Sequence, residues 1–390
     1  MVTMPLFFQT LPRSLSHRSP TTRIALVCGL VASLLLAQPL RLSPAARAEG
    51  AWEITPQSEQ ALERGLEWLA RNQGADGNWG SNDLGLVSMG VLAFLAAGHT
   101  PGRGKYGKAV DRALDYVLRN AKPSGLLNIS GQRRDMYNHG LATFVLGQAH
   151  GMTSDPRISP VLERALKLIA NTQCDDGGWD YVARRQSRGH DLSLAVMQAK
   201  ALRSAMDSGF EVPPEVVELA IKSVRGYYRA RGAAGSEAKM KRLPGQFTYS
   251  GGSGTLAMAA AGVVCMQEFG QYDDWRIAKN MEIITAAVKR IRPRKKTGQL
   301  PLDAYTLYYV GQALYQVGGK HWRGAYPSLR DAVTESQKNG MWRDIGHVKG
   351  RPGELYGTSV ACFILAIPNR YLPILQEGKI ESIRKAVGKR

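Results

Sequence analysis

Cysteine is scarce in this chain of 390 residues, which contains only four. Cys28 lies in the first segment, and Cys174, Cys265 and Cys362 are widely separated along the rest of the sequence. This spacing predicts neither a disulfide framework nor a metal site. We expect the last three cysteines to be buried as small apolar residues. We expect no bound metal and no cofactor.

Acidic residues are missing from the N-terminus. A basic stretch there precedes the apolar run 24–37, which is too short to span a membrane comfortably. Ala46 and Ala48 then offer small residues for cleavage. We therefore predict that residues 1–48 are a signal peptide and that residues 49–390 are exported to the periplasm or the extracellular space. The alternative is an uncleaved N-terminal membrane anchor.

Acids are also outnumbered in the whole chain, with 32 Asp and Glu against 51 Lys and Arg. Loss of residues 1–48 would remove five arginines and no acids, lowering the formal net charge from +19 to +14. Such a charge suits an anionic membrane or an acidic polysaccharide surface, and the alternative is a solvated basic surface without a specific partner. No nucleic-acid motif is present, so we expect no nucleic-acid partner. The oligomeric state stays open.

A strand pattern of any length is missing as well, and the chain instead repeats one segment. Residues 62–80 align with residues 162–180, and residues 336–342 form a shorter copy. The copies share a glutamine, a glycine and a tryptophan, which are Gln73, Gly77 and Trp79; Gln173, Gly177 and Trp179; and Gln337, Gly340 and Trp342. We expect the glycine to end a helix, the tryptophan to pack, and the glutamine to bond exposed backbone groups. Asp175 and Asp176 are then turn and capping residues rather than catalytic ones.

Two kinds of helical pattern alternate along the chain. One kind is amphipathic with a single apolar stripe, and it is predicted at 58–73, 106–121, 159–173, 215–230, 275–291 and 322–337. The other is apolar on nearly every side and therefore buried, and it is predicted at 83–98, 135–151, 190–205, 252–270, 302–319 and 354–367. The sequence therefore predicts an all-α fold of about six hairpins closed into an α/α toroid. Residues 124–132, 235–252 and 293–301 are predicted to be connecting loops.

The repeated motif resembles the QW motif of squalene and oxidosqualene cyclases, which occurs more loosely in protein prenyltransferase β subunits. The resemblance covers residues 52–367 and implies the α/α toroid that these proteins share. The D-x-D-D acid motif of the cyclases is absent here. Of the zinc ligands of the prenyltransferases, Asp303 is present, but Tyr305 and Gly357 stand where Cys and His would be. The resemblance thus implies the fold without either known catalytic apparatus.

Polar residues recur at the predicted N-termini of the buried helices, which a toroid brings to one end. As candidate catalytic residues we select Asp83, His139, Asp191 and Asp303. As candidate ligand-binding residues we select Tyr137, His190, Tyr249, Tyr305 and Tyr356. The alternatives are helix capping for the aspartates, a buried core position for the histidine, and ordinary lining for the tyrosines.

Three functional hypotheses remain open from the sequence. In the first, the axial cavity binds or transforms an isoprenoid or lipid without the usual cyclase or zinc chemistry. In the second, the toroid is a non-enzymatic scaffold or binding module. In the third, it is a toroid-type lyase acting on an acidic polysaccharide, with a cluster that comprises Arg133, Arg134, Tyr137, Asn138 and His139.

Overall fold

The computed structural model describes residues 52–232, 236–346 and 353–376. The predicted signal peptide, and the anchor that is its alternative, lie outside the described residues. Within the described part, no helix is both long and apolar enough to cross a membrane. Cys174, Cys265 and Cys362 are free and buried, which confirms their predicted role as small interior residues.

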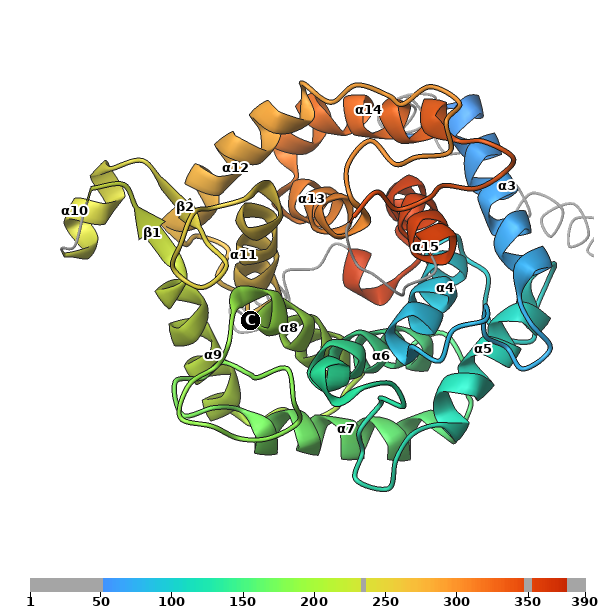
Figure 1. Cartoon of the computed structure of the whole chain (residues 1–390), viewed down its shortest axis with the longest axis horizontal. Coiled ribbons are helices and arrows are strands. Elements are labelled where there is room, and N and C mark those ends of the chain that lie inside the picture. Colours follow the sequence, from blue (N-terminus) through green and yellow to red (C-terminus); the bar gives the residue numbers. More distant parts are fainter. Residues whose placement is uncertain (1–51, 233–235, 347–352, 377–390) are drawn as a thin grey trace, which may run out of the picture. The chain divides into compact units, whose positions relative to one another are not determined.

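Six of the described helices form an inner ring (Figure 1). They are α4 (Leu84–Ala96), α6 (Asp135–His150), α8 (Leu192–Asp207), α11 (Leu256–Glu268), α13 (Ala304–Val317) and α15 (Gly353–Ala366). Each packs against the next in chain order, and α15 packs against α4, which closes the ring. All residues of α4 are buried, as expected for a helix that is apolar on every side.

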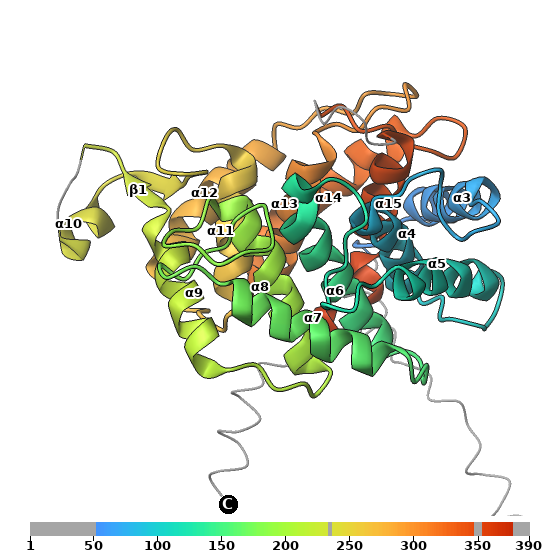
Figure 2. The same ribbon diagram turned by 60° about the horizontal axis from the view of Figure 1, so that its bottom comes forward.

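Six further helices surround this ring (Figures 1 and 2). They are α3 (Pro56–Asn72), α5 (Gly107–Arg119), α7 (Ile158–Thr172), α9 (Pro214–Gly226), α12 (Trp275–Val288) and α14 (Gly319–Ser336). Their apolar stripes face inward: α5 packs on α4, α7 on α6, α12 on α11, and α3 on α15. The predicted toroid of six hairpins is confirmed.

The three Gln–Gly–Trp segments each tie one outer helix to the next. Every glutamine donates its Nε2 hydrogen to a main-chain carbonyl of the following outer helix. The bonds are Gln73 to Ala109 (2.8 Å), Gln173 to Val216 (2.9 Å) and Gln337 to Ala61 (2.8 Å). Since Ala61 lies in α3, the third segment joins the last outer helix to the first.

The glycine and the tryptophan of these segments also keep the same roles. The indole Nε1 donates to a carbonyl of the preceding outer helix, in the pairs Trp79–Leu69 (2.8 Å), Trp179–Ile169 (2.9 Å) and Trp342–Val333 (2.8 Å). The glycines have positive φ angles, and a Cβ on each would press against a carbonyl oxygen of the next outer helix. Only glycine combines that backbone angle with so close an approach.

A fourth turn of this kind lies in the connection from α5 to α6 and contacts α7, and the Gln–Gly–Trp motif does not predict it. Gly125 has a φ of 89°, and a Cβ there would press against the carbonyl of Arg164 in α7. Neither a glutamine nor a tryptophan accompanies this glycine. The glycine turn therefore also occurs in the ring where the Gln–Gly–Trp motif is incomplete.

The segment between α9 and α11 differs from its prediction as a helix followed by a loop. The outer helix ends at Gly226, because β1 (Tyr228–Ala230) pairs antiparallel with β2 (Gly245–Phe247). The six-residue α10 (Glu237–Arg242) lies between the two strands. Backbone pairing thus overrides the helical pattern predicted to continue to residue 230. Short 3-10 turns complete the described elements, at Gln132–Arg134, Ile367–Asn369 and Pro373–Leu375.

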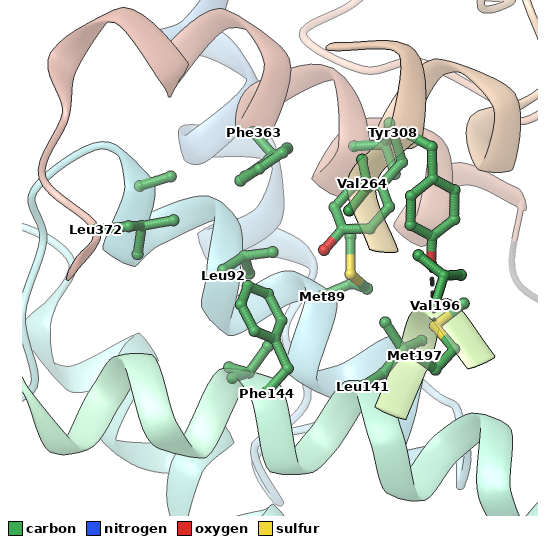
Figure 3. Packing of buried hydrophobic residues seen from close by; sticks show 14 of the residues in the cluster. Met89, Leu92, Leu141, Phe144, Val196, Met197, Val264, Tyr308, Phe363 and Leu372 are labelled. Atoms are coloured by element: carbon green, nitrogen blue, oxygen red, sulfur yellow. Dashed lines mark hydrogen bonds between the residues drawn. The ribbon is translucent and has the colours of Figure 1, made fainter. Parts of the chain in front are cut away.

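The centre of the ring is filled by side chains from all six inner helices (Figure 3). The contributors are Met89 and Leu92 from α4, Phe144 from α6, Met197 from α8, Val264 from α11, Tyr308 from α13 and Phe363 from α15. Each of them is almost completely buried. At this level the axis of the ring is a packed core.

One ion pair is buried within that core. Lys200 of α8 is 1% exposed, and its Nζ lies 3.2 Å from Oε1 of Glu268 in α11. Nζ also donates to Oε1 of Gln312 in α13 and lies 4.1 Å from the centre of the Phe144 ring. Burial lowers the pKa of Lys200, and the Glu268 carboxylate opposes that shift. The pair therefore links three inner helices, with the aromatic ring of a fourth beside it.

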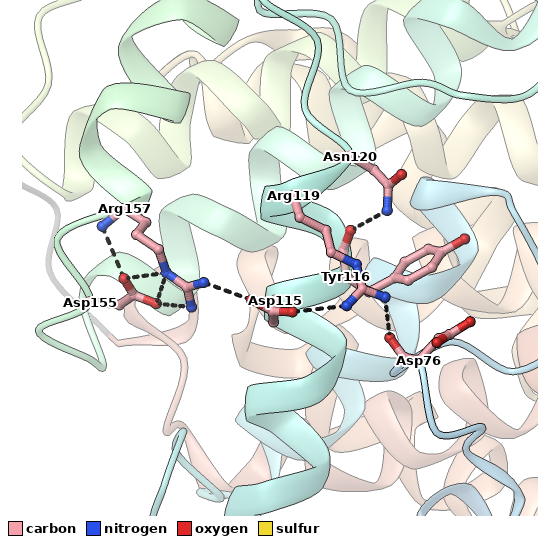
Figure 4. A network of polar contacts seen from close by, with 7 residues as sticks. All are labelled: Asp76, Asp115, Tyr116, Arg119, Asn120, Asp155 and Arg157. Atoms are coloured by element: carbon pink, nitrogen blue, oxygen red, sulfur yellow. Dashed lines mark hydrogen bonds and ion pairs between the residues drawn. The ribbon is translucent and has the colours of Figure 1, made fainter.

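A polar network at the surface joins α5 to the start of α7 (Figure 4). Arg157 donates to Asp115 at 2.7 Å, and Arg119 bonds both Asp115 at 3.1 Å and the carbonyl of Asp76 at 2.8 Å. These side chains are about half exposed. Such exposed pairs contribute at most about 1 kcal/mol each, so packing and the Gln–Gly–Trp turns hold the outer ring more strongly.

Candidate functional site

Tyrosines and a histidine–aspartate pair gather where several inner helices begin. We call this site the mouth, and its members are Tyr137, Tyr181, His190, Asp191, Tyr249 and Tyr305. Tyr137 lies in the first turn of α6, Asp191 is the N-cap of α8, and Tyr305 lies in the first turn of α13. The other three belong to the segments that lead into α8 and α11. The ring thus brings together residues from distant parts of the chain.

Asp191 is the centre of the mouth. Its carboxylate caps α8 by accepting the N–H of Ser193 at 2.9 Å. It also lies 2.8 Å from Nδ1 of His190 and accepts the hydroxyl of Tyr181 at 2.9 Å. The Asp191 side chain is fully buried, whereas that of His190 is 54% exposed. With the ring proton held on Nδ1, the Nε2 lone pair of His190 is free to act on a ligand.

Tyr181 connects this pair to the other tyrosines. Its hydroxyl contacts both Asp191 and the hydroxyl of Tyr249, and its ring stacks on Tyr137 with centres 6.3 Å apart. Burial raises the pKa of Tyr181, and its hydrogen bonds to Tyr249 and Asp191 raise it further. Tyr181 therefore stays protonated at neutral pH and is a hydrogen donor. Sequence reasoning missed it, because it lies in a connection that has no helical periodicity.

Tyr305 and Tyr356 adjoin the same cluster. Burial raises the pKa of Tyr305 well above its ordinary value, and the neighbouring Tyr137, Tyr309 and Tyr356 add to the shift. The five candidate ligand-binding residues thus lie at the same end of the ring. His190 and Tyr249 both contact Tyr181, and Tyr137 and Tyr356 are neighbours of Tyr305.

Two of the candidate catalytic aspartates have structural contacts that occupy them. Asp83 caps α4 by accepting the N–H of Leu86 at 3.1 Å, and it pairs with Arg134 at 3.0 Å. Asp303 caps α13 by accepting the N–H of Thr306 at 2.9 Å. These contacts favour the capping interpretation for both. Asp191 also caps a helix, but it holds His190 and Tyr181 in addition.

His139 lies in the interior and points toward the outer ring. Its Nδ1 accepts the N–H of Leu127 at 3.2 Å, so the proton is on Nε2, which lies 3.1 Å from the carbonyl of Ala165 in α7. Burial lowers the pKa of His139 to about 4. These contacts favour the core-histidine interpretation, and they place the available histidine of the mouth at His190 instead.

Two pockets share His190 in their linings. One has a volume of about 520 Å³ and is lined by Arg133 and Tyr181 among others, and the second, of about 530 Å³, is lined by Arg188 and Tyr227 among others. Asp180, Arg184 and His190 belong to both linings. A ligand that extended from one pocket to the next would therefore pass the His190 ring.

No protein-family model matches this chain, and no curated protein matches it either. Several solved structures do. The cellobiose 2-epimerase of Spirochaeta thermophila aligns with a TM-score of 0.55 and 14% identity over 85% of this chain and 98% of its own. An inactive variant of the alpha-1,6-mannanase GH76A of Salegentibacter, in complex with alpha-1,6-mannotriose, aligns with a TM-score of 0.52 and 9% identity over 84% and 100%.

A third similar structure is a variant of the type II terpene cyclase MstE of Scytonema, in complex with geranylgeranyl dihydroxybenzoate. It aligns with a TM-score of 0.52 and 14% identity over 81% of this chain and 98% of its own. At these identities the likeness shows the fold alone. The protein has the α/α toroid fold that the epimerase, the mannanase and the terpene cyclase share, as the resemblance in the sequence implied.

Proposed function

We propose that the protein is an exported toroid that binds a glycan at its mouth and catalyses a proton-transfer reaction on it. The observation that carries this proposal is the His190–Asp191 pair beside Tyr181. The pair supplies a base oriented by a buried carboxylate, and the Tyr181 hydroxyl donates to that carboxylate and helps to hold it in place. His190 lines two pockets, and Tyr181 lines one of them.

The side chains of the mouth suit a sugar. A tyrosine ring presents a flat apolar face with a hydroxyl at one edge. A sugar ring likewise combines a face of C–H groups with a rim of hydroxyls, so Tyr181, which lines one of the two pockets, can contact both parts. Two of the similar structures support this assignment, since one is named for its action on cellobiose and the other contains alpha-1,6-mannotriose.

The isoprenoid hypothesis has support of its own from the terpene cyclase among the similar structures. It needs room for a long apolar molecule along the axis, and the described residues at mid-axis pack against one another. It stays a hypothesis, ranked second to the glycan. Export stays a proposal too, and N-terminal sequencing of the mature protein tests it: a start at Glu49 supports cleavage, and a start at Met1 supports the anchor.

The test compares His190→Ala and Tyr181→Phe with the wild-type protein on a glycan array and in turnover assays. His321→Ala is the matched control, because that histidine bonds Thr285 on the outer ring at 2.9 Å. We expect wild type and control to bind and convert the same glycan, and His190→Ala to bind it with turnover reduced about 100-fold or more. Absence of glycan binding by the wild type would reject the proposal. Binding without turnover would support the scaffold hypothesis instead.

A further inference from the structure

We propose that the glycan is a polyanion that lies across both pockets, with one acidic group bound by Arg133 and another by Arg188. This inference rests on the proposed function, and it names the substrate class for the same site. The two arginines line different pockets, and His190 belongs to the linings of both. The acidic groups would therefore belong to different sugar units of the same chain.

The charged residues in the two pocket linings indicate the charge of the ligand. Asp180 is the carboxylate common to both pockets, and it is occupied by Arg184 at 3.5 Å, by the side chain of Gln186 and by the N–H of Tyr181. Each pocket then retains one arginine that Asp180 does not neutralise. Each of the two pockets therefore has an excess of positive charge in its lining, which favours anionic groups there.

The two remaining arginines have little else to bind. Arg133 makes no ion pair with another described residue. Arg188 is 79% exposed and only approaches Asp176, at 4.0 Å. The Asp176 carboxylate already accepts the N–H groups of Gly178 and Gly189 at 3.0 and 2.8 Å, so it is engaged in holding the turn. A planar guanidinium in such a position matches a carboxylate or sulfate with two parallel hydrogen bonds.

The residues that both pockets share bear on the length of the ligand. Each pocket has the volume of an ordinary small-molecule site, at about 500 Å³. Because the arginines line different pockets, a single sugar unit held in one pocket would meet one arginine, whereas a chain that occupied both pockets would meet both. The geometry therefore favours an oligomer or polymer over a monosaccharide.

This substrate defines a β-elimination that uses the groups of the mouth. Nε2 of His190 takes the proton from the carbon next to a uronate carboxylate, whose charge an arginine neutralises. The electron pair forms a carbon–carbon double bond, and the bond from the next carbon to the glycosidic oxygen breaks. Nε2 of His190 then gives the same proton to that leaving oxygen, while the Tyr181 hydroxyl keeps its hydrogen bond to Asp191. One product ends in a new hydroxyl and the other in an unsaturated uronate.

Titration calorimetry with oligouronides of one to six units, and with neutral oligosaccharides of the same lengths, tests the inference. We expect the uronides to bind more tightly than the neutral series, with affinity rising at least tenfold from one unit to three. Arg133→Ala and Arg188→Ala should each remove that tenfold gain, about the contribution of one charge-assisted bond. Arg185→Ala is the matched control, since Arg185 pairs with Asp175 at 2.8 Å and lines neither pocket.

The outcomes separate this inference from the function on which it rests. Tighter binding of the neutral series, or equal binding of one and three units, would overturn the inference and leave a glycan-binding mouth. Equal effects of Arg185→Ala and Arg188→Ala would overturn the assigned arginines. If no member of either series binds, both proposals fail. Ultraviolet absorbance from an unsaturated product, lost in His190→Ala, supports the elimination, and its absence with every uronide that binds would overturn that step.

Discussion

Replacing Lys200 with methionine measures how strongly the ring depends on its buried ion pair. Methionine keeps most of the side-chain length and removes the ammonium group. The Glu268 carboxylate, itself almost completely buried, would keep the bond from Gln316 at 2.9 Å but lose its cation at 3.2 Å. Breaking a buried pair in this way costs about 3–5 kcal/mol, because one charge is left in the interior uncompensated. We therefore expect the free energy of unfolding to fall by about 4 kcal/mol.

The double variant Lys200→Met/Glu268→Leu distinguishes the unpaired charge from lost packing. Two apolar side chains of similar size replace both charges, and such exchanges are often neutral or stabilising. We expect the double variant to be more stable than Lys200→Met by about 3 kcal/mol. Lys105→Met is a surface control, because Lys105 pairs with Glu63 where both side chains are about half exposed. It should leave the unfolding midpoint nearly unchanged.

Urea unfolding followed by circular dichroism and tryptophan fluorescence supplies the free energies. Coincidence of the two signals would confirm that unfolding is a single transition. A Lys200→Met variant as stable as the wild type would refute the assignment of a buried, charge-bearing pair. A double variant no better than the single one would show that the loss comes from packing around Phe144 and Gln312 rather than from Glu268.

Two other predictions concern the frame of the ring. Trp179→Ala should lower the free energy of unfolding by about 3–5 kcal/mol, and Trp179→Phe by less, since phenylalanine fills most of the space and loses mainly the bond to Ile169; a midpoint unchanged in Trp179→Ala would contradict the packed role. Burial lowers the pKa of His139 from 6.5 to about 4, so its contribution to stability is present above pH 6.5 and is lost as the pH falls toward 4. The loss should amount to about 3 kcal/mol, and His139→Asn should flatten urea midpoints measured between pH 7 and 4, whereas an unchanged slope would point to another group.

Most of the fold could be predicted from the sequence, because its periodicities are local. A helix such as α4 is apolar on all sides, and this alone predicts burial within an inner layer. The strands β1 and β2 could not be predicted in the same way. Their three residues each are too few for a pattern, and β2 also bonds a distant helix, since the N–H of Phe247 donates to Asn280 of α12 at 3.1 Å.

The candidate site was predictable in place but not in detail. Helix N-termini indicated one end of the ring, and the tyrosines chosen there do lie together. Which histidine faces that end depends on side-chain contacts that the sequence does not give. His139 bonds the carbonyl of Ala165 in α7 and is buried, whereas His190 bonds Asp191 and is exposed. The buried ion pair of Lys200 could not be predicted, because its partner Glu268 lies on another helix and the sequence does not show that the two meet.

The contact between Gln337 and Ala61 has a consequence for how the protein is made. It joins α14 to α3, and Arg64 donates to Gln337 across 273 positions of the chain at 2.8 Å. A ribosome adds residues in order, so this contact forms only after α14 has been synthesised. Until then the side of α4 that will meet α15 stays uncovered and apolar. Closing such distant contacts is slow, and the growing chain is open to aggregation until its last hairpin arrives.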